Sequence, residues 1–342
     1  MKLSKKQKKQ NLLLAGGILA AAALLIGGFF VVSRLRAGDA KQNETQPEDP
    51  YANENEDALT YYDGKWYRKK DGLNTFLLMG VDQYQEDTLI DGDLNNQDAD
   101  LLLLMVMDPN EQTCKVLQLN RDTMTTMDTL DADGNVTGSV VTQQLALAHV
   151  YGSGGTDSCR NTVNAVSNLL MGADIQHYAS VTMDAVKILN DLSGGVPIQS
   201  LDDFNGNGGL TVKSGDKITL TGDQALAYVR ARQGMDDSTN VHRMQRQKQY
   251  LQALQQKFGE KCEQSTTFFA DAVLKISDYL TSDCDVYKLQ ELNDQYQTYQ
   301  IKQLDDLAGN GTVNADNRLE YVVDSDSVQQ TVLELFYEQT EK

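Results

Sequence analysis

Residues 75–81 read TFLLMGV and residues 101–107 read LLLLMVM, two short and nearly continuous apolar runs. Runs of this length without polar alternation are typical of strands that are buried on both faces of a sheet. A third run covers residues 115–119, and the Asp-Pro-Asn sequence at 108–110 has the composition of a turn. The sequence therefore predicts adjacent buried strands, the second and third of which form a hairpin.

Helical patterns alternate with strand patterns along the rest of the chain. Another strand is expected at 178–183, and alternating strands and helices indicate an α/β layer structure. Beyond residue 260 we expect two helices, a strand near 319–323 and a final helix at 325–339. Apolar spacing and cap residues predict the earlier helices at 141–150, 156–171, 184–192, 222–231 and 240–258.

The N-terminal segment has the pattern of a membrane anchor. Residues 1–10 contain five lysines and no acid, and residues 12–32 contain no charge. A helix over the uncharged run would be roughly 31 Å long, enough to cross the hydrocarbon core of a membrane. The lysines predict a cytoplasmic N-terminus and an extracellular remainder. A cleaved signal peptide is the alternative, and it also places the bulk of the chain outside the membrane.

These patterns divide the 342 residues into parts with different compositions. The stretch after the span is polar and acidic, as in a flexible stalk. The strand and helix patterns then fill one main domain and a mostly helical C-terminal α/β extension. The predicted parts are a cytoplasmic tail at 1–10, a transmembrane helix at 11–33, a stalk at 34–72, the main domain at 73–258 and the extension at 259–342.

The overall composition is that of a folded protein with a strong acidic balance. Hydrophobic residues make up 40% of the chain, and its formal net charge is −19. Binding to nucleic acid needs a surplus of lysine and arginine, so the composition argues against a nucleic-acid partner. Any phosphate site must be a local basic cluster, which makes the positions of the arginines informative.

Two aspartates stand at the ends of the buried strands. Asp82 directly follows the first run, and Asp100 directly precedes the second. Carboxylates at the ends of adjacent strands can meet at one edge of a sheet, and two of them suit a Mg²⁺ ion that also holds a substrate phosphate. The alternative is that both cap turns. Asp87, Asp91 and Asp93 in the intervening segment keep the choice of first metal ligand open.

Arginines gather after the third strand and again near residue 240. Arg121 follows the strand at 115–119 and faces the same edge of the sheet, where Asp122 could anchor it. Guanidinium groups match phosphate oxygens in bidentate pairs, so the second cluster predicts an anion site, with a salt-bridge network as the alternative. The second cluster contains Arg230, Arg232, Arg243 and Arg246, and Gln247 shares a helix face with Arg243.

A metal beside an arginine cluster points to a diphosphate. Because the main domain is expected outside the membrane, free nucleotides are poor candidates. A diphosphate on a membrane-anchored lipid carrier is the expected ligand.

The four cysteines permit disulfides in an exported chain. Cys262 and Cys284 bracket a short helical segment and make the most natural local pair, which leaves Cys114 with Cys159. Buried free thiols are the alternative. None of the four has the spacing of a metal ligand, and the histidines do not form such a spacing with them.

In their order along the chain, these motifs resemble the LytR–CpsA–Psr family of bacterial cell-wall enzymes. The resemblance runs from about Leu73 to Leu254, and the predicted N-terminal span with an outside domain also matches the family's topology. The similarity depends on the ordered set of motifs rather than on any one of them. The blocks lie at 76–82, 98–109, 121–123, 148–152, 177–178, 194–196 and 225–232, followed by Arg243 and the Arg-Gln pair at 246–247.

The resemblance implies a central mixed sheet flanked by helices and a hydrophobic pocket for a polyprenyl chain. It also implies a phosphotransferase that moves a glycopolymer from undecaprenyl diphosphate to the muramic acid 6-hydroxyl of peptidoglycan. A non-catalytic surface receptor for lipid-linked precursors or wall glycan is the alternative. Asp82 and Asp100 would hold Mg²⁺ or Mn²⁺, Asp122 could orient or deprotonate the acceptor hydroxyl, and Arg121, Arg230, Arg232, Arg243 and Gln247 would bind the diphosphate.

Several positions depart from the family pattern. Asp98 stands where many members have arginine, and Asn120 stands where many have proline. Gln143 and Gln144 occupy a region where some members have lysine. Fewer cations near the diphosphate could weaken its binding or mark a subgroup with another acceptor or polymer.

Overall fold

The computed structural model describes most of the chain from residue 59 onward. The predicted cytoplasmic tail, the transmembrane helix and the stalk up to residue 58 lie outside the described residues, as do Arg232 and the acidic segment with Asp87, Asp91 and Asp93. Within the part that is described, no helix combines the length and apolar character that a membrane span requires. The described residues are 59–82, 95, 97–231, 241–265, 267–296, 299–314 and 318–341.

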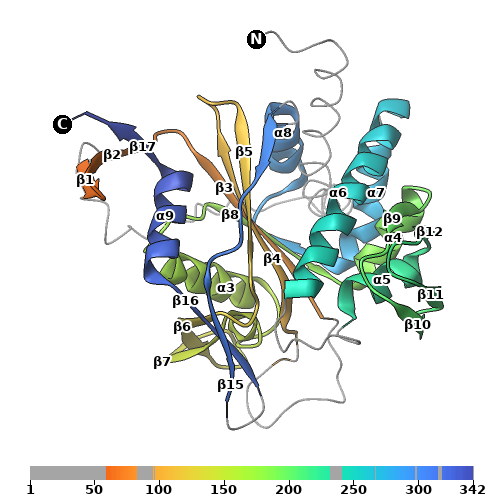
Figure 1. Cartoon of the computed structure of the whole chain (residues 1–342), viewed down its shortest axis with the longest axis horizontal. Coiled ribbons are helices and arrows are strands. Elements are labelled where there is room, and N and C mark those ends of the chain that lie inside the picture. Colours follow the sequence, from red (N-terminus) through yellow and green to blue (C-terminus); the bar gives the residue numbers. More distant parts are fainter. Residues whose placement is uncertain are drawn as a thin grey trace, which may run out of the picture.

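A mixed sheet with the strand order β13-β8-β3-β4-β5-β14 forms the centre of the fold (Figure 1). Its three middle strands are antiparallel neighbours, which confirms the predicted hairpin, while β8 and β14 join in parallel to β3 and β5. The expected central mixed sheet is therefore present. The strands are β3 (Asn74–Val81), β4 (Ala99–Asp108), β5 (Thr113–Leu119), β8 (His177–Thr182), β13 (Leu280–Ser282) and β14 (Gln300–Gln303).

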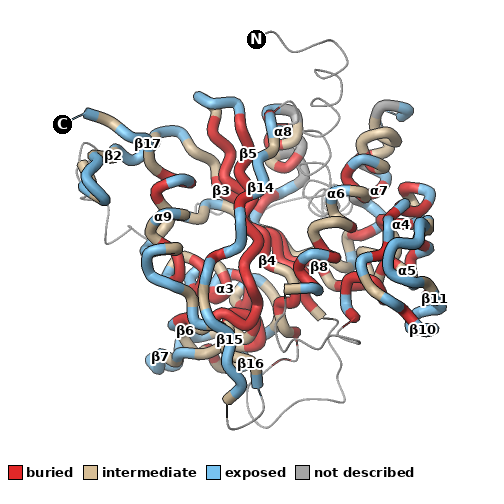
Figure 2. The backbone as a smooth tube through the Cα atoms, viewed as in Figure 1, coloured by how far each residue is buried: buried red, intermediate tan, exposed pale blue. Residues whose placement is uncertain are grey.

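Successive side chains of the central strands alternate between two apolar cores. Phe76 and Leu78 belong to one core, and Leu77 and Met79 belong to the other. Because side chains of a strand point alternately to the two faces, both faces need apolar residues when both are covered. This explains the continuous apolar runs in the sequence, and Figure 2 shows the middle strands as the most deeply buried part of the molecule.

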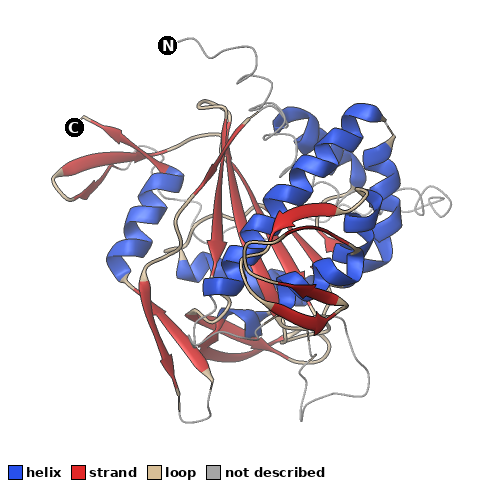
Figure 3. Cartoon of the chain, turned by 45° about the vertical axis from the view of Figure 1, so that its right-hand side comes forward, coloured by secondary structure: helices blue, strands red, loops and turns tan. Residues whose placement is uncertain are grey.

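Helices cover both faces of the sheet, as the α/β pattern predicted (Figures 1 and 3). The Leu77 core is closed by α3 (Thr156–Leu169), the short 3₁₀ helix η2 (Leu145–Ala148) and α9 (Ser325–Phe336). The Phe76 core is closed by α4 (Asp184–Leu192), α5 (Gly222–Arg230), α6 (Val241–Gln264), α7 (Phe268–Ile276) and α8 (Val286–Tyr296).

Small sheets surround this layered centre. A three-stranded antiparallel sheet joins β1 (Leu59–Tyr62), β2 (Lys65–Lys69) and β17 (Tyr337–Thr340), so both ends of the described chain meet in it. The remaining strands form antiparallel pairs: β6 (Met124–Leu130) with β7 (Val136–Gln144), β9 (Val196–Gln199) with β12 (Lys217–Leu220), β10 (Phe204–Asn207) with β11 (Leu210–Val212), and β15 (Gly309–Val313) with β16 (Leu319–Val323).

The helix predicted at 141–150 is wrong. Residues up to Gln144 belong to β7, which pairs with β6, and only η2 follows. The β-branched residues of β7 favour a strand once a partner strand is available, and tertiary pairing overrides the local apolar spacing. The final helix also ends at Phe336 rather than 339, because the next residues pair with β2.

The C-terminal extension is built into the central sheet. The boundary drawn at residue 258 falls inside α6, and β13 and β14 occupy the two edges of the sheet. Short edge strands have too few residues to give a clear pattern in the sequence. They become strands through their hydrogen bonds with the neighbouring strands β8 and β5.

The disulfide expectation is wrong, because all four cysteines are free in the structure. Cys114 lies in the Phe76 core and Cys159 lies in the Leu77 core, so the sheet separates them. Cys262 and Cys284 both pack in or against the Phe76 core without forming a bond. Burial raises the pKa of the Cys262 thiol to about 11 and of Cys114 and Cys159 to about 12, which favours the protonated form.

Truncation of a central core residue should destabilise the fold. Leu104 on β4 is fully buried, so we expect Leu104→Ala to lower the free energy of unfolding by about 3 kcal/mol through lost burial and a cavity. Val140→Ala is a matched control, because the Val140 side chain on β7 is 65% exposed. Denaturant unfolding followed by circular dichroism measures both. Equal stability of the two variants would contradict the assigned core.

Candidate functional site

Charged residues far apart in the sequence meet beside the end of β3 and the start of β4. Asp82 directly follows β3, and its backbone N–H donates a hydrogen bond to the Asp98 carbonyl at 3.2 Å. This bond holds the segment before β4 against the end of β3. Asp82, Asp98 and Asp100 therefore reach the same edge of the sheet, as the strand ends predicted for the first and last of them.

A β-bulge sets the position of Asp100. Gly80 pairs with Leu101, whereas Val81 pairs with Ala99, so Asp100 is the extra residue with no partner on β3. Bulges re-aim side chains and are frequent beside active sites. The Asp100 side chain is consequently directed to the charged cluster although it belongs to a strand buried on both faces.

Arg121 is placed by a turn at the end of β5. The Asn120 side-chain oxygen accepts the Asp122 N–H at 3.0 Å, and the Thr123 N–H donates to the Asn120 carbonyl at 3.0 Å. An Asx turn of this kind fixes the local backbone without proline. Asn120, which stands where many family members have proline, therefore positions Arg121 through the hydrogen bonds of this turn.

Arg121 lies among several carboxylates. Its Nη1 forms an ion pair with Asp100, its Nη2 lies 2.6 Å from Asp98 Oδ2, and its Nε lies 3.6 Å from Asp122 Oδ1. Arg121 is 6% exposed, so these ion pairs are poorly screened by solvent. Burial opposes the charge, but the neighbouring Asp100 and Asp98 outweigh it and raise the pKa of the guanidinium further.

Arg243 and Arg230 complete the cluster from the helical side. Arg243, in the first turn of α6, is 2% exposed, and its Nη1 lies 3.2 Å from the same Asp100 oxygen that Arg121 contacts. Arg230, the last residue of α5, reaches Asp82 Oδ1 at 2.7 Å with a half-exposed side chain. We call Asp82, Asp98, Asp100, Arg121, Arg230 and Arg243 the carboxylate–arginine cluster. It has a buried floor and an open side at Arg230.

The surroundings of Asp82 make the ionised form of its carboxyl group unfavourable. Burial raises the pKa of Asp82, and the nearby Asp100 and Asp98 raise it further, while Arg230 partly opposes them. The buried Asp82 Oδ1 is in ionic contact with Arg230 Nη2 at 2.7 Å and has no hydrogen-bond partner among the residues that the structure describes. Carboxylate oxygens are the ligands that Mg²⁺ prefers, and this cluster offers carboxylates from Asp82, Asp98 and Asp100.

The other predicted anion ligands have different surroundings. Gln247, one turn after Arg243, accepts a hydrogen bond from Gln118 Nε2 at 2.9 Å and donates to the Val229 carbonyl at 3.4 Å. Arg246 points away from the cluster: its guanidinium bonds to the Tyr228 and Ala231 carbonyls and to Asp202. Arg246 therefore ties α6 to the end of α5. Arg232 lies outside the described residues.

Asp122 is held by neighbouring side chains. Besides the Arg121 contact, its Oδ1 accepts a hydrogen bond from Gln144 Nε2 at 3.3 Å. Gln143, the second glutamine in the region where some family members have lysine, accepts from the Tyr151 hydroxyl at 3.1 Å. Both glutamines thus form hydrogen bonds here and do not supply the positive charge that a lysine would. Asp98 likewise adds a carboxylate at a position where many members have arginine.

The motif at 148–152 supports the segment before Asp98. His149 is fully buried, and its Nδ1 lies 3.1 Å from the Gln97 carbonyl oxygen. Burial lowers the pKa of His149 to about 4, so it is neutral and its Nδ1–H donates to that carbonyl. Asn95 donates to the His149 and Gly152 carbonyls. This motif acts on the cluster by positioning the segment that carries Asp98.

An apolar cavity of about 50 Å³ lies beside the cluster, between the sheet and helices α4, α5 and α6. Gln247 lines it at the cluster side, and Leu78, Gly80 and Leu101 contribute from the sheet. A Cβ on Gly80 would lie 3.0 Å from the Leu101 Cβ and 3.2 Å from the Met183 Cε, so a larger residue would crowd this wall. The cavity and the charged cluster therefore share a border.

Two features of the structure, one at the site and one elsewhere, have no clear signal in the sequence. Gln118 sits within the apolar run of β5, yet its side chain supports Gln247 from the opposite element. On another part of the surface, His177, Asp283 and Cys284 place possible metal-ligand atoms within 4.8 Å of one another. His177 Nδ1 lies 3.2 Å from Asp283, which fastens β8 to the residues after β13. Spacing along the chain could not reveal this convergence.

Comparisons with known proteins agree on one family. The model described as the LytR_cpsA_psr family matches residues 29–336. The chain is 29% identical over 241 residues to the polyisoprenyl-teichoic acid–peptidoglycan teichoic acid transferase TagU of Halalkalibacterium halodurans, covering 70% of each protein. It is 31% identical over 186 residues to TagU of Bacillus subtilis, which covers 54% of this chain and 52% of that protein.

Solved structures show the same fold. B. subtilis TagV superposes with a TM-score of 0.58 at 25% identity, over 78% of this chain and 97% of that chain. A structure of TagT bound to LI-WTA superposes with a TM-score of 0.54 at 19% identity, over 78% of this chain and 90% of that chain. At that identity the second likeness concerns the fold alone.

Removal of the Asp82 charge should stabilise the protein at neutral pH. The folded state raises the pKa of Asp82, so ionised Asp82 costs stability above that raised pKa, and the cost vanishes below the ordinary value of 3.8. We expect Asp82→Asn to melt at a higher temperature than the parent at pH 7 and at the same temperature at pH 3. The exposed Asp133→Asn is the control. A lower melting temperature for Asp82→Asn at pH 7 would contradict this assignment.

Proposed function

Since this chain belongs to the LytR–CpsA–Psr family, we propose that it is a phosphotransferase that moves a glycopolymer from a polyisoprenyl diphosphate to peptidoglycan. The observation that carries the proposal is the meeting of Arg121 and Arg243 on one buried carboxylate, Asp100, beside an apolar cavity. A ligand with a charged group joined to a long apolar tail fits this arrangement, because the charged group can bind at the cluster while the tail lies in the cavity. The names of the TagU relatives give the same reaction class.

The guanidinium groups suit a diphosphate for a physical reason. Arg121 and Arg243 are buried and held by carboxylates, so they are already oriented before a ligand arrives. Arg230 is half-exposed at the open side and can exchange Asp82 for a phosphate oxygen. Preorganised positive charge stabilises negative charge that develops on the leaving phosphate. Arg232 is proposed to add to this group.

The same cluster fits a divalent cation. Asp82 and Asp98 lie close to Asp100, and the buried Asp82 Oδ1 contacts Arg230 but has no hydrogen-bond partner within the described part of the chain. Asp82 and Asp100 would hold Mg²⁺ or Mn²⁺, with Asp98 as a further carboxylate close by. When bound, the ion supplies positive charge for the diphosphate oxygens. The negative charges of Asp82 and Asp100 repel each other, and a bound cation would offset this repulsion.

The acceptor hydroxyl needs a carboxylate that accepts its proton. Attack of the hydroxyl oxygen forms the new bond to phosphorus, while the bond to the lipid phosphate oxygen breaks and the electron pair leaves with the lipid phosphate. Asp122 is oriented by Arg121 and Gln144, and Asp82 is partly exposed with a raised pKa. We propose Asp122 as the group that orients or deprotonates the hydroxyl, with Asp82 as the alternative.

The lipid tail is proposed to enter the apolar cavity. Its volume of about 50 Å³ is far smaller than a polyprenyl chain, so the side chains between α4 and α6 must move apart on binding. We further propose that the uncharged run at 12–32 anchors the chain in the cell membrane, with the main domain outside. This arrangement would keep the cluster near a lipid-linked donor.

Loss of a buried guanidinium should abolish transfer. With a synthetic polyprenyl-diphosphate sugar, glycan oligomers and Mg²⁺, we expect Arg121→Ala to slow product formation by about 100-fold or more. Arg160→Ala is the matched control, since Arg160 is exposed on α3. Mass spectrometry of the product measures the reaction, and thermal melting verifies folding. Binding of the donor without any turnover in the parent protein would favour the receptor alternative.

A metal at the carboxylates should stabilise the folded protein. Because a ligand that binds only the native state raises its stability, we expect Mg²⁺ to raise the melting temperature of the parent. Asp100→Asn should lose this increase, and Asp133→Asn should keep it. Differential scanning calorimetry with and without chelator makes the comparison. An increase of the same size in Asp100→Asn would place the metal elsewhere.

A further inference from the structure

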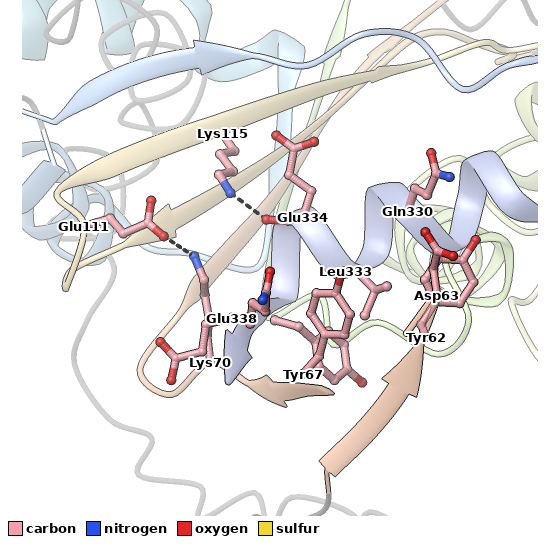
Figure 4. Close-up of a pocket in the computed structure, with 12 residues that line it drawn as sticks. Tyr62, Asp63, Tyr67, Lys70, Glu111, Lys115, Gln330, Leu333, Glu334 and Glu338 are labelled. Carbon is pink, nitrogen blue, oxygen red and sulfur yellow. Dashed lines mark hydrogen bonds and ion pairs between the residues drawn. The ribbon is translucent and has the colours of Figure 1, made fainter. Parts of the chain in front are cut away.

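A second pocket lies at the opposite end of the central sheet. Its volume is about 510 Å³, within the range of small-ligand sites. The pocket is open to the surface, and its lining comes from the β1–β2 hairpin, β17, α9, β5 and the turn between β4 and β5 (Figure 4). Asp100 stands at the start of β4 and this turn follows its end, so the ten residues of β4 separate the two sites by roughly 30 Å.

Tyrosines form one wall of the pocket. Tyr62, Tyr67 and Tyr337 line it, and all three are partly exposed. The strand register explains why they lie together: Tyr62 pairs with Lys65, Tyr67 with Gln339 and Tyr337 with Lys69, which places them on one face of the small sheet. Tyr61 lies on the other face, stacked 4.9 Å from Trp66.

Lysines and hydrogen-bonding groups form the rest of the lining. Lys115 is 8% exposed and donates to the Glu334 carbonyl at 2.5 Å, as Figure 4 shows. Lys70 is neutralised by Asp108 and Glu111, at 2.7 and 2.5 Å. Lys115, by contrast, has no ion pair with any carboxylate of the described residues. Its ammonium group therefore retains hydrogen-bond donors for a ligand carbonyl. Gln330 on α9 and Gln339, which pairs with Tyr67, add amide groups.

The charges of the lining select against phosphate. Four acidic residues line the pocket against two lysines, and Lys70 is already paired. A phosphate-rich polymer would meet carboxylates here, whereas the arginines of the first cluster suit it. Partly exposed tyrosine rings pack against the apolar faces of sugar rings, and carboxylates and amides accept or donate hydrogen bonds to hydroxyl and acetamido groups.

We infer that this pocket binds an uncharged N-acetylhexosamine glycan. The sugar rings pack on Tyr62 and Tyr67, the Lys115 ammonium donates to an acetamido carbonyl, and the Gln339 amide, which lies on the Tyr67 face of the small sheet, forms hydrogen bonds with sugar hydroxyls. The role of this binding rests on the proposed function, because an acceptor glycan held here would be presented to the carboxylate–arginine cluster at a raised local concentration. The binding itself needs no catalysis and can be tested separately.

The test is calorimetric titration of the full chain in detergent with a β-linked N-acetylglucosamine oligomer. We expect saturable binding by the parent, and about tenfold weaker binding by Tyr67→Ala, which removes a ring from the wall. Tyr67→Phe keeps the ring and should restore most of the affinity. Tyr61→Ala is the matched control, since Tyr61 is in the same hairpin but on the opposite face and 58% exposed. It should bind as the parent does.

A second variant guards against a folding defect in the hairpin. Gln330 is exposed on α9 at the pocket, so Gln330→Trp should fill the pocket and block the glycan while the melting temperature stays unchanged. Arg121→Ala should bind the glycan normally even if it transfers nothing, which separates this inference from the proposed function. The inference is overturned by an absence of saturable binding in the parent. It is equally overturned if Tyr61→Ala loses binding as Tyr67→Ala does, or if a glycerol phosphate oligomer binds this pocket more tightly than the sugar.

Discussion

The central constraint in this structure is the burial of Asp100 between two arginines. Its side chain belongs to a strand covered on both faces, where an isolated carboxylate would be very costly. Arg121 from the end of β5 and Arg243 from the start of α6 meet on the same Asp100 oxygen and supply the missing charge. Each arginine in turn needs the carboxylate. The bulge at Gly80 and Val81 makes the arrangement possible, because it turns Asp100 away from the two apolar cores.

The rest of the site follows from that buried set of charges. Asp98 and Asp82 add negative charge, and Arg230 balances it from the open side, so the cluster combines a rigid floor with an accessible rim. Gln247 then links the charged region to the apolar cavity, because it is one helical turn from Arg243 and lines the cavity wall. A ligand with a diphosphate head and an apolar tail would place its head at the cluster and its tail in the cavity.

The two ends of the central sheet offer different chemistry. One end carries arginines and carboxylates in near balance, while the pocket at the other end combines tyrosines, amides and an excess of acids. The C-terminal part of the chain contributes to that second end through α9 and β17. Residues 259–342, which carry no recognisable family motif, thus complete the sheet at its edges and build a pocket that the main domain alone does not possess.

The sequence by itself determined the central strands, most of the helices and the family, because continuous apolar runs and ordered motifs are local properties. It also pointed to Asp82, Asp100, Arg121, Arg230 and Arg243 as one group. Only the tertiary structure decided that Arg246 faces away, that 141–150 is mainly strand, that β13 and β14 form sheet edges and that the cysteines stay free. Those outcomes depend on which distant partner a residue meets, and spacing along a chain does not specify the partner.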